Sequence, residues 1–187
     1  MRLLSLTPPL EEYPAQKKVV EDIKTDLVKP FPMQRLVQGD VGSGKTVVAA
    51  LAALQVIESW YQVAIMAPTE ILAEQHYTNF VKWFEPLGIN VAWLTGKLKA
   101  APRREALNML VTAEASLAVG THALFQNDVE FKNLALVIID EQHRFGVHQR
   151  LALRNKGVDN NAETGSDTAA PHQLIMTATP IPRTLSM

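Results

Sequence analysis

A three-layer α/β/α fold, with helices on both faces of a mainly parallel sheet, is the architecture that this sequence predicts. Short apolar segments alternate along the chain with longer segments of helical character, which is the order of strands joined by crossover helices. Several of the apolar segments lack a polar face, as strands do when helices cover both sides of a parallel sheet. These two patterns indicate one α/β unit.

The elements follow in order from the same patterns. Apolar runs predict six strands, at 35–39, 62–68, 90–95, 116–121, 134–140 and 173–179. Helical segments are expected at 15–27, 44–59, 71–84 and 103–112, with a shorter helix after Phe145. The segment 157–171 is rich in Asn, Asp, Gly, Ser and Thr and has almost no large apolar residue, so a mobile surface loop is expected there.

Composition excludes several classes of protein. With 187 residues and 47% hydrophobic content the chain can bury the core of one domain. Its net charge of -1 argues against binding of nucleic acid or membrane through bulk charge, so any polyanion must be met by local groups. The absence of cysteine excludes disulfides and thiolate metal sites. No run approaches the ~20 apolar residues that span a bilayer, so we expect a cytoplasmic protein without a membrane partner.

The segment GDVGSGKT matches the phosphate-loop pattern G-x-x-x-x-G-K-[ST] at the junction of a predicted strand and a predicted helix. Its glycines allow backbone N–H groups to surround phosphate oxygens at the helix N-terminus. Lys45 would neutralise β- and γ-phosphate charge, and the Thr46 hydroxyl would bind Mg²⁺. The residues predicted to hold ATP in this loop are Gly39, Asp40, Val41, Gly42, Ser43, Gly44, Lys45 and Thr46.

A second acidic element ends the apolar run LALVIID. Asp140 and Glu141 would lie at the carboxyl edge of the sheet, where ligands of open α/β folds bind. We expect Asp140 to hold Mg²⁺, directly or through water, and Glu141 to orient or deprotonate the attacking water. Acidic residues also end strands as solvated caps, but the phosphate loop upstream favours the catalytic interpretation.

Three segments together, GDVGSGKT, DEQHRFGV and MTATPIPRT, resemble the RecG family of ATP-dependent DNA helicases within the DExH branch of superfamily two. Other segments resemble the motifs between them in the matching order: APTEILAEQH (67–76), LTGK (94–97) and VGTHAL (119–124). Mfd-like translocases are the nearest alternative, but they usually carry Glu-Glu-Gln-Arg where this chain has Glu141, Gln142, His143 and Arg144. The RecG family is therefore favoured.

The resemblance implies that residues 15–187 form the first RecA-like lobe of a phosphate-loop NTPase, with 1–14 as an N-terminal extension of unassigned role. It gives Gln16 the place of a residue that reads adenine, although EEYPAQ stands where the family usually has a Leu-Thr pair. An exposed helix residue is the alternative for Gln16. His143 would sense the γ-phosphate or link the acidic motif to the segment around Thr177. The residues expected to couple nucleotide to DNA are Gln142, Thr177, Thr179 and Arg183.

The family pattern also implies contacts with DNA backbone phosphates by Thr69, Gly96, Lys97, Thr121 and His122. Ordinary turn and helix-cap roles remain open for each of these residues, since Thr69 stands where a cap would. Arg103 and Arg104 are expected to be a solvated helix start. The three tryptophans, Trp60, Trp83 and Trp93, are expected to pack rather than to stack on bases.

Helicases of this type hydrolyse ATP between two RecA-like lobes, and the resemblance covers only the first. We therefore expect a fragment of a larger enzyme, which would add a second lobe and a DNA-wedge domain, act on branched DNA, and be inactive as this piece alone. A stand-alone phosphate-loop ATPase or kinase would explain Lys45 and Asp140 but not the later motifs. A nucleotide-regulated binding module without turnover also remains open.

Overall fold

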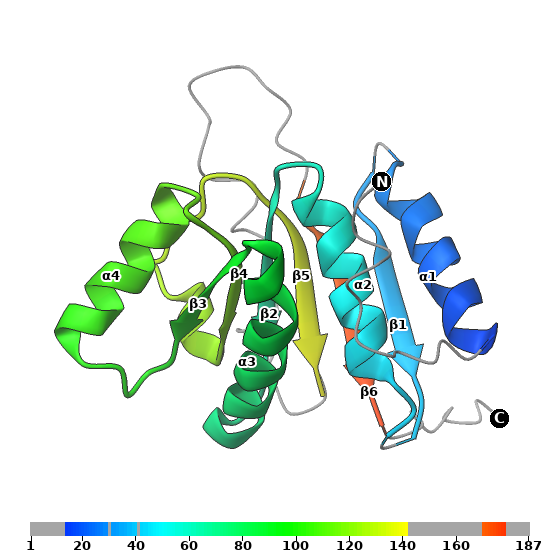
Figure 1. Ribbon diagram of the computed structural model, residues 1–187, viewed down its shortest axis with the longest axis horizontal. Coiled ribbons are helices and arrows are strands. Elements are labelled where there is room, and N and C mark those ends of the chain that lie inside the picture. Colours follow the sequence, from blue (N-terminus) through cyan, green and yellow to red (C-terminus); the bar gives the residue numbers. More distant parts are fainter. Residues whose placement is uncertain (1–13, 30, 41, 142–169, 179–187) are drawn as a thin grey trace, which may run out of the picture.

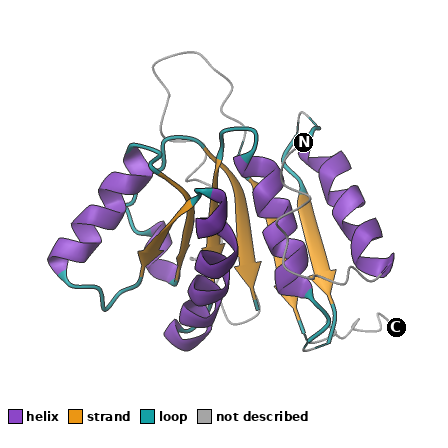
Figure 2. Ribbon diagram, viewed as in Figure 1, coloured by secondary structure: helices purple, strands orange, loops and turns teal. Residues whose placement is uncertain are grey.

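Six parallel strands form one sheet in the computed structural model, which describes residues 14–29, 31–40, 42–141 and 170–178 (Figures 1 and 2). The strands are β1 (Gln34–Gln38), β2 (Gln62–Met66), β3 (Asn90–Leu94), β4 (Ala115–Gly120), β5 (Leu134–Asp140) and β6 (His172–Thr177). The helices are α1 (Pro14–Leu27), α2 (Lys45–Ile57), α3 (Glu70–Phe84) and α4 (Ala100–Val111), with short 3₁₀ turns η1 (Glu85–Leu87) and η2 (His122–Phe125).

The order of strands across the sheet is β1-β6-β5-β2-β4-β3. The chain therefore leaves β1, crosses to β2, builds the β2-β4-β3 half, and then returns to insert β5 and β6 between β2 and β1. Because all pairs are parallel, the carboxyl ends of all six strands meet at one edge of the sheet. The segments after β1, β5 and β6 therefore begin at one half of this edge, and those after β2, β4 and β3 begin at the other half.

Two apolar cores cover opposite faces of the sheet, because successive side chains of a strand point to opposite sides. In β5, Leu136 and Ile138 belong to one core, and Val137 and Ile139 belong to the other. The first core includes residues of α1, α2 and α3, and the second includes residues of α4 and η2. This arrangement confirms the three-layer α/β/α prediction, and the sheet is parallel throughout.

Element boundaries differ from the sequence predictions by a few residues, each for a local reason. Helix α2 begins at Lys45 because Gly44 has a left-handed backbone, with φ 82°. Helix α4 begins at Ala100, earlier than predicted, since Pro102 is tolerated in a first helical turn. Strand β2 ends at Met66, before Pro68, which has no backbone N–H to donate. The helix expected after Phe145 and most of the loop 157–171 lie outside the described residues.

Candidate active site

The phosphate loop lies between β1 and α2, as the pattern predicted. Gly42 and Gly44 have φ values of 83° and 82°, which an L side chain rarely adopts. A Cβ on Gly39 would lie 2.5 Å from Ser43 Oγ, so the Ser43 side chain would have to move to accept a larger residue there. The glycines therefore shape the loop, and Thr46 follows as a partly buried residue in the first turn of α2.

The ammonium group of Lys45 is bound by its own loop. Lys45 Nζ donates to the carbonyl oxygens of Gly39 at 2.6 Å and Asp40 at 2.8 Å. This holds the cation at the mouth of the loop, where a phosphate oxygen can replace a neutral carbonyl partner with a charged one. The arrangement fits a triphosphate ligand.

Gln16 lies on the phosphate loop itself. Its Nε2 donates to the carbonyl oxygen of Ser43 at 2.9 Å, and a Cβ added to Gly44 would lie 2.0 Å from the same nitrogen. Helix α1 therefore contacts the loop through this amide. The role in adenine recognition stays a prediction.

Asp140 ends β5 with its side chain only 14% exposed. One carboxylate oxygen, Oδ2, lies 2.7 Å from His76 Nε2, which leaves the other oxygen for a cation. The described residues contain no cluster of three or more His, Asp or Glu side chains that could hold a metal by itself. A magnesium ion that shares its ligands between Asp140, Thr46 and nucleotide phosphates needs no such cluster, so this donor set fits Mg²⁺.

Glu141 connects the end of β5 to the end of β6. Its Oε1 accepts from the backbone N–H of Ala178 at 2.9 Å, and Thr177 Oγ1 lies 3.4 Å from its Oε2. The backbone of Glu141 has φ 51°, in the left-handed region that non-glycine residues seldom occupy. An uncommon backbone conformation at the predicted catalytic carboxylate supports a functional role for this residue.

The structure brings the residues predicted for nucleotide chemistry to adjacent strands. Strands β1, β6 and β5 are neighbours, and the backbone N–H of Gly39 donates to the carbonyl oxygen of Thr177 at 3.3 Å. Lys45, Asp140 and Thr177 therefore follow or end three consecutive strands. Predicted site residues outside the described residues are Val41, Gln142, His143, Thr179 and Arg183.

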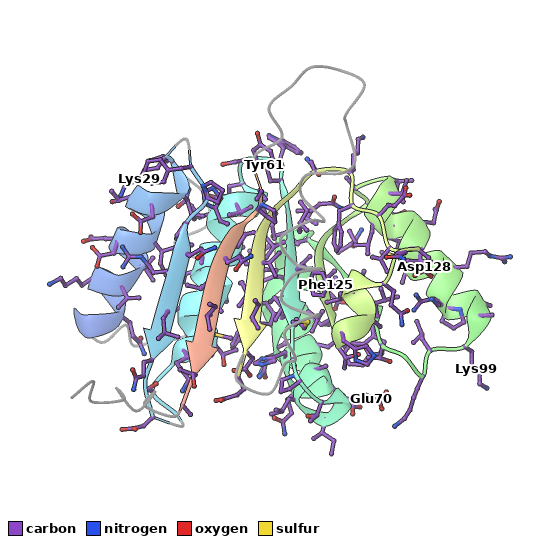
Figure 3. The ribbon with its side chains drawn as sticks, turned by 180° about the vertical axis from the view of Figure 1, so that it is seen from behind. Lys29, Tyr61, Glu70, Lys99, Phe125 and Asp128 are labelled. Carbon is purple, nitrogen blue, oxygen red and sulfur yellow. The ribbon has the colours of Figure 1, made fainter. Side chains whose placement is uncertain are left out.

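The residues predicted to contact DNA follow the other three strands, β2, β4 and β3, at the same edge. Thr69 caps α3 by accepting from the backbone N–H of Leu72 at 3.3 Å, so the helix-cap role is present. Lys97 Nζ lies 2.6 Å from Glu70 Oε2, with the Lys97 side chain 83% exposed. Figure 3 shows Glu70 at this edge of the molecule and Tyr61 at the opposite edge.

The remaining predicted DNA contacts differ in exposure. Gly96 and His122 are exposed, which leaves both accessible to a large ligand. Thr121 is buried, and its hydroxyl has no hydrogen-bond partner among the residues that the structure describes. In this conformation the Thr121 hydroxyl faces the interior, so the expected contact through a surface hydroxyl is not available to it.

Arg103 is not the solvated residue that the sequence suggested. Its guanidinium donates to Asp128 Oδ2 at 2.7 Å and to Gln126 Oε1 at 2.9 Å, and its side chain is 19% exposed. This pairing ties the first turn of α4 to the segment after η2. Arg104 is exposed, as expected.

Two of the three tryptophans pack as predicted. Trp83 lies edge-on to Phe80, with ring centroids 5.6 Å apart, and Trp93 lies 5.1 Å from Tyr77. Trp60 differs, since it is 88% exposed with φ 66°. The prediction was wrong for this residue because Trp60 lies in the turn after α2, which points its side chain away from both cores.

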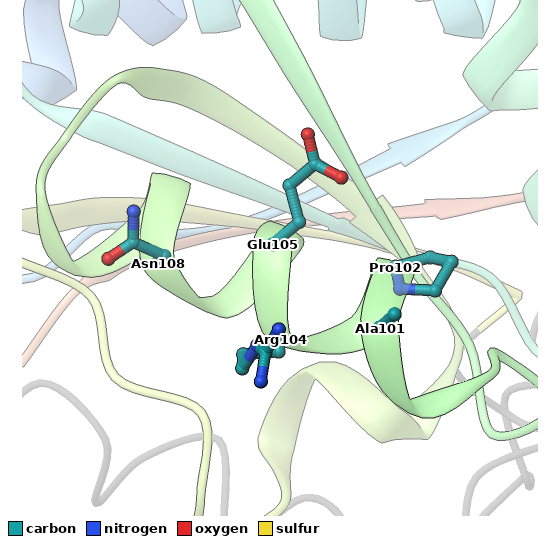
Figure 4. Close-up of a pocket in the computed structure, with 5 residues that line it drawn as sticks. All are labelled: Ala101, Pro102, Arg104, Glu105 and Asn108. Atoms are coloured by element: carbon teal, nitrogen blue, oxygen red, sulfur yellow. The ribbon is translucent and has the colours of Figure 1, made fainter.

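A hollow beside α4 is separate from the phosphate loop. Its lining residues all come from this helix: Ala101, Pro102, Arg104, Glu105 and Asn108 (Figure 4). Helix α4 packs against β3 and β4, whereas the phosphate loop follows β1 at the opposite end of the strand order. The hollow therefore takes no part in nucleotide chemistry.

Sequence reasoning missed His76 as a site residue. His76 is the last residue of APTEILAEQH, and its contact with Asp140 joins residues 64 positions apart. A histidine in the apolar stripe of a helix gives no local signal of a carboxylate partner.

Among the described residues, no helix is long and apolar enough to cross a membrane.

Comparison with known proteins agrees with this site. The model of the DEAD/DEAH box helicase family matches residues 13–187. The chain is 62% identical over 181 residues to the ATP-dependent DNA helicase RecG of Haemophilus influenzae, covering 97% of this chain and 25% of that protein. It is 58% identical over 179 residues to the RecG of Escherichia coli K12, covering 96% of this chain and again 25% of the relative.

Solved structures give the same result for the fold. A structure of RecG bound to a three-way DNA junction superposes with a TM-score of 0.78 at 43% identity, covering 94% of this chain and 22% of that one. The helicase domain of Pyrococcus furiosus Hef has a TM-score of 0.65 at 22% identity, over 92% of this chain and 34% of that one, and shows the fold alone.

The chain spans about a quarter of the length of the curated relatives that it matches. It belongs to the DEAD/DEAH box helicase family, in which it corresponds to the first RecA-like lobe of a RecG helicase.

Proposed function

We propose that this chain is the ATP-binding motor lobe of a DNA helicase that couples ATP hydrolysis to translocation on branched DNA and to its remodelling. The remodelling would include fork reversal and branch migration of Holliday junctions during recombination and repair. The observation that carries the proposal is the position of Lys45, Asp140 and Glu141 at the carboxyl ends of β1 and β5, the two strands that flank β6. The cofactors are ATP and Mg²⁺.

Nucleotide binding rests on the phosphate loop. Lys45 exchanges its two loop carbonyl partners for β- and γ-phosphate oxygens, and backbone N–H groups at the start of α2 bind the same phosphates. Gln16 contacts the loop from α1 through the carbonyl oxygen of Ser43, and its proposed role is to bind the adenine base. Thr46 and Asp140 would hold Mg²⁺, and the bound ion would supply positive charge beside the phosphates.

Hydrolysis needs a water molecule aligned with the γ-phosphate. Both carboxylate oxygens of Glu141 accept hydrogen bonds at the end of β6, Oε1 from the backbone N–H of Ala178 and Oε2 from the Thr177 hydroxyl. A carboxylate fixed in this way orients a water and accepts its proton in one geometry. Since the partners lie in the segment that resembles motif III, a movement of this segment by DNA alters the alignment of Glu141.

DNA binding is assigned to the loops after β2, β3 and β4. Thr69, Gly96, Lys97 and His122 lie in these loops, where hydroxyl, backbone and cationic groups contact phosphates without reading sequence. A branched substrate is favoured over plain duplex because one similar protein has been solved on a three-way DNA junction. The second RecA-like lobe and a wedge domain are proposed as partners within a longer chain, since the curated relatives are about four times as long.

The test is an ATPase measurement on the full-length protein with a three-way junction, with linear duplex of the same base composition, and without DNA. Junction DNA is expected to raise turnover well above linear duplex, and Lys45→Ala is expected to abolish both. Equal stimulation by linear duplex would instead favour an Mfd-like double-stranded DNA translocase. ATP binding without turnover under every condition would favour a nucleotide-regulated module and reject the helicase proposal.

A further inference from the structure

His76 is a buried histidine on the apolar stripe of α3. The buried residues of this helix are Ala73, His76, Phe80 and Phe84, spaced by three or four positions, so all of them face the sheet. His76 is the polar member of this stripe, and it is 8% exposed. Its Nε2 lies 2.7 Å from Asp140 Oδ2, so the imidazole meets the predicted metal ligand rather than a neutral core group.

The contact crosses the boundary between the two halves of the sheet edge. Asp140 ends β5, which belongs to the nucleotide half, whereas α3 follows β2, the first strand of the half that carries the predicted DNA contacts. Thr69, at the N-cap of α3, precedes His76 by seven residues, which is about two helical turns or roughly 10 Å along one rigid helix. Helix α3 therefore begins at Thr69, a predicted DNA contact, and through His76 it contacts Asp140, the carboxylate that is predicted to hold magnesium.

We propose that His76 is a positioning residue, which fixes the Asp140 carboxylate for Mg²⁺ and makes α3 the link between the DNA-facing loop and the metal. This inference rests on the proposed function. An ionised carboxylate only accepts hydrogen bonds, so His76 donates from Nε2 to one oxygen of Asp140 and leaves the second oxygen for the metal. Partners of this kind orient metal ligands, and their loss costs about 10- to 100-fold in metal affinity or activity.

A purely structural histidine would give a different pattern of mutant effects. The variants needed are His76→Leu, which keeps an apolar side chain of similar bulk but removes the donor, and His76→Gln, whose amide nitrogen reaches the position of Nε2. Phe80→Leu is the matched control, because Phe80 lies on the same stripe, is fully buried, and stands four residues from His76. All three alter packing of α3, but only His76→Leu removes the contact with Asp140.

Calorimetry on the 187-residue chain would measure ATP affinity with Mg²⁺ and with the metal chelated, and thermal unfolding would report stability. We expect His76→Leu to reduce the gain in affinity that Mg²⁺ provides by about 10- to 100-fold, while metal-free ATP binding changes little. His76→Gln should keep the gain within a few-fold of the parent. Phe80→Leu should lower the unfolding temperature and leave the gain unchanged.

Two results would overturn the inference. One is a His76→Leu variant in which Mg²⁺ raises ATP affinity as much as it does in the parent. The other is a Phe80→Leu variant that loses as much of this increase as His76→Leu does. Failure of the proposed function would look different, because the parent chain itself would then show neither ATP binding that depends on Lys45 nor any gain with Mg²⁺. That outcome would also remove the basis of the inference, whereas the first two leave the proposed function intact.

Discussion

Glu141 accepts a hydrogen bond from the backbone N–H of Ala178 across 2.9 Å, which joins the residue after β5 to the residue after β6. The same two segments are joined by the backbone, since Glu141 N–H donates to the carbonyl oxygen of Met176 at 2.9 Å. The acidic motif and the later Thr-containing motif are therefore one physical unit at the sheet edge. A unit of this kind can transmit movement of either segment to the carboxylate.

We predict that Glu141→Gln in the full-length protein keeps ATP binding and loses turnover. The glutamine Oε1 can still accept from Ala178, so the side chain stays in place, but an amide cannot take a proton from water. Loss of a positioned general base typically costs about 10²- to 10⁴-fold in rate. Steady-state ATPase kinetics beside calorimetry would measure both effects, and turnover within a few-fold of the parent would move the catalytic role to another residue.

Lys45→Ala is predicted to weaken ATP binding by at least about tenfold without unfolding the domain. The cation is partly buried and lies among loop carbonyls, where a triphosphate has no other cationic side chain in the loop to meet it. The matched control is Lys97→Ala, which removes a highly exposed cation from the other half of the edge. Equal ATP affinity of the parent and Lys45→Ala in calorimetry would reject the prediction.

A third prediction concerns the close approach of β3 and β4. A Cβ on Gly120 would lie 1.8 Å from the carbonyl oxygen of Leu94, which belongs to the paired strand and cannot move without breaking the ladder. Gly120→Ala is therefore expected to destabilise the fold by at least about 2 kcal/mol, or roughly 4 °C or more in Tm. Gly96→Ala serves as the control, because nothing lies within 4 Å of its added Cβ. Similar melting temperatures for the two variants would contradict the expected clash.

The stability of the fold should fall at mildly acidic pH because of His172. Burial lowers the pKa of His172 from its usual 6.5, with nearby Asp26 opposing the shift, and His172 Nδ1 accepts from the backbone N–H of Met33 at 2.9 Å. Below pH 6.5 His172 binds a proton in the unfolded chain, whereas in the folded chain it does so only at lower pH. The contribution of neutral His172 to the free energy of unfolding is therefore complete above pH 6.5 and is lost as the pH falls toward the folded pKa.

His172→Asn would test this dependence, since the asparagine Oδ1 can accept from Met33 but does not titrate. Urea unfolding at about pH 7.5 and about pH 5.5 is expected to show a smaller loss of stability in the variant than in the parent. An unchanged loss would assign the pH dependence to other groups. Asp26 titrates at lower pH, because hydrogen bonds from Lys29 and Arg35 lower the pKa of its carboxyl below 3.8.

The sequence by itself determined the features that depend on neighbouring residues. Glycine spacing with a following Lys45 specifies a phosphate-binding turn, because backbone conformation and helix start are local properties. An apolar run that stops at Asp140 places a carboxylate at a strand end for the same reason. The ordered motifs were enough to predict the RecG family and the α/β class, and both predictions are confirmed.

Only the tertiary structure decided which of these local features meet. Contacts of His76 with Asp140, of Gln16 with Ser43 and of Arg103 with Asp128 join residues 25 to 64 positions apart, and depend on the order of strands. Apolar periodicity specifies that a strand is buried but not which strand lies beside it, since many orders bury similar apolar surface. The exposure of Trp60 was decided in the same way, because a turn at the edge of the sheet, rather than the hydrophobicity of the residue, sets where its side chain lies.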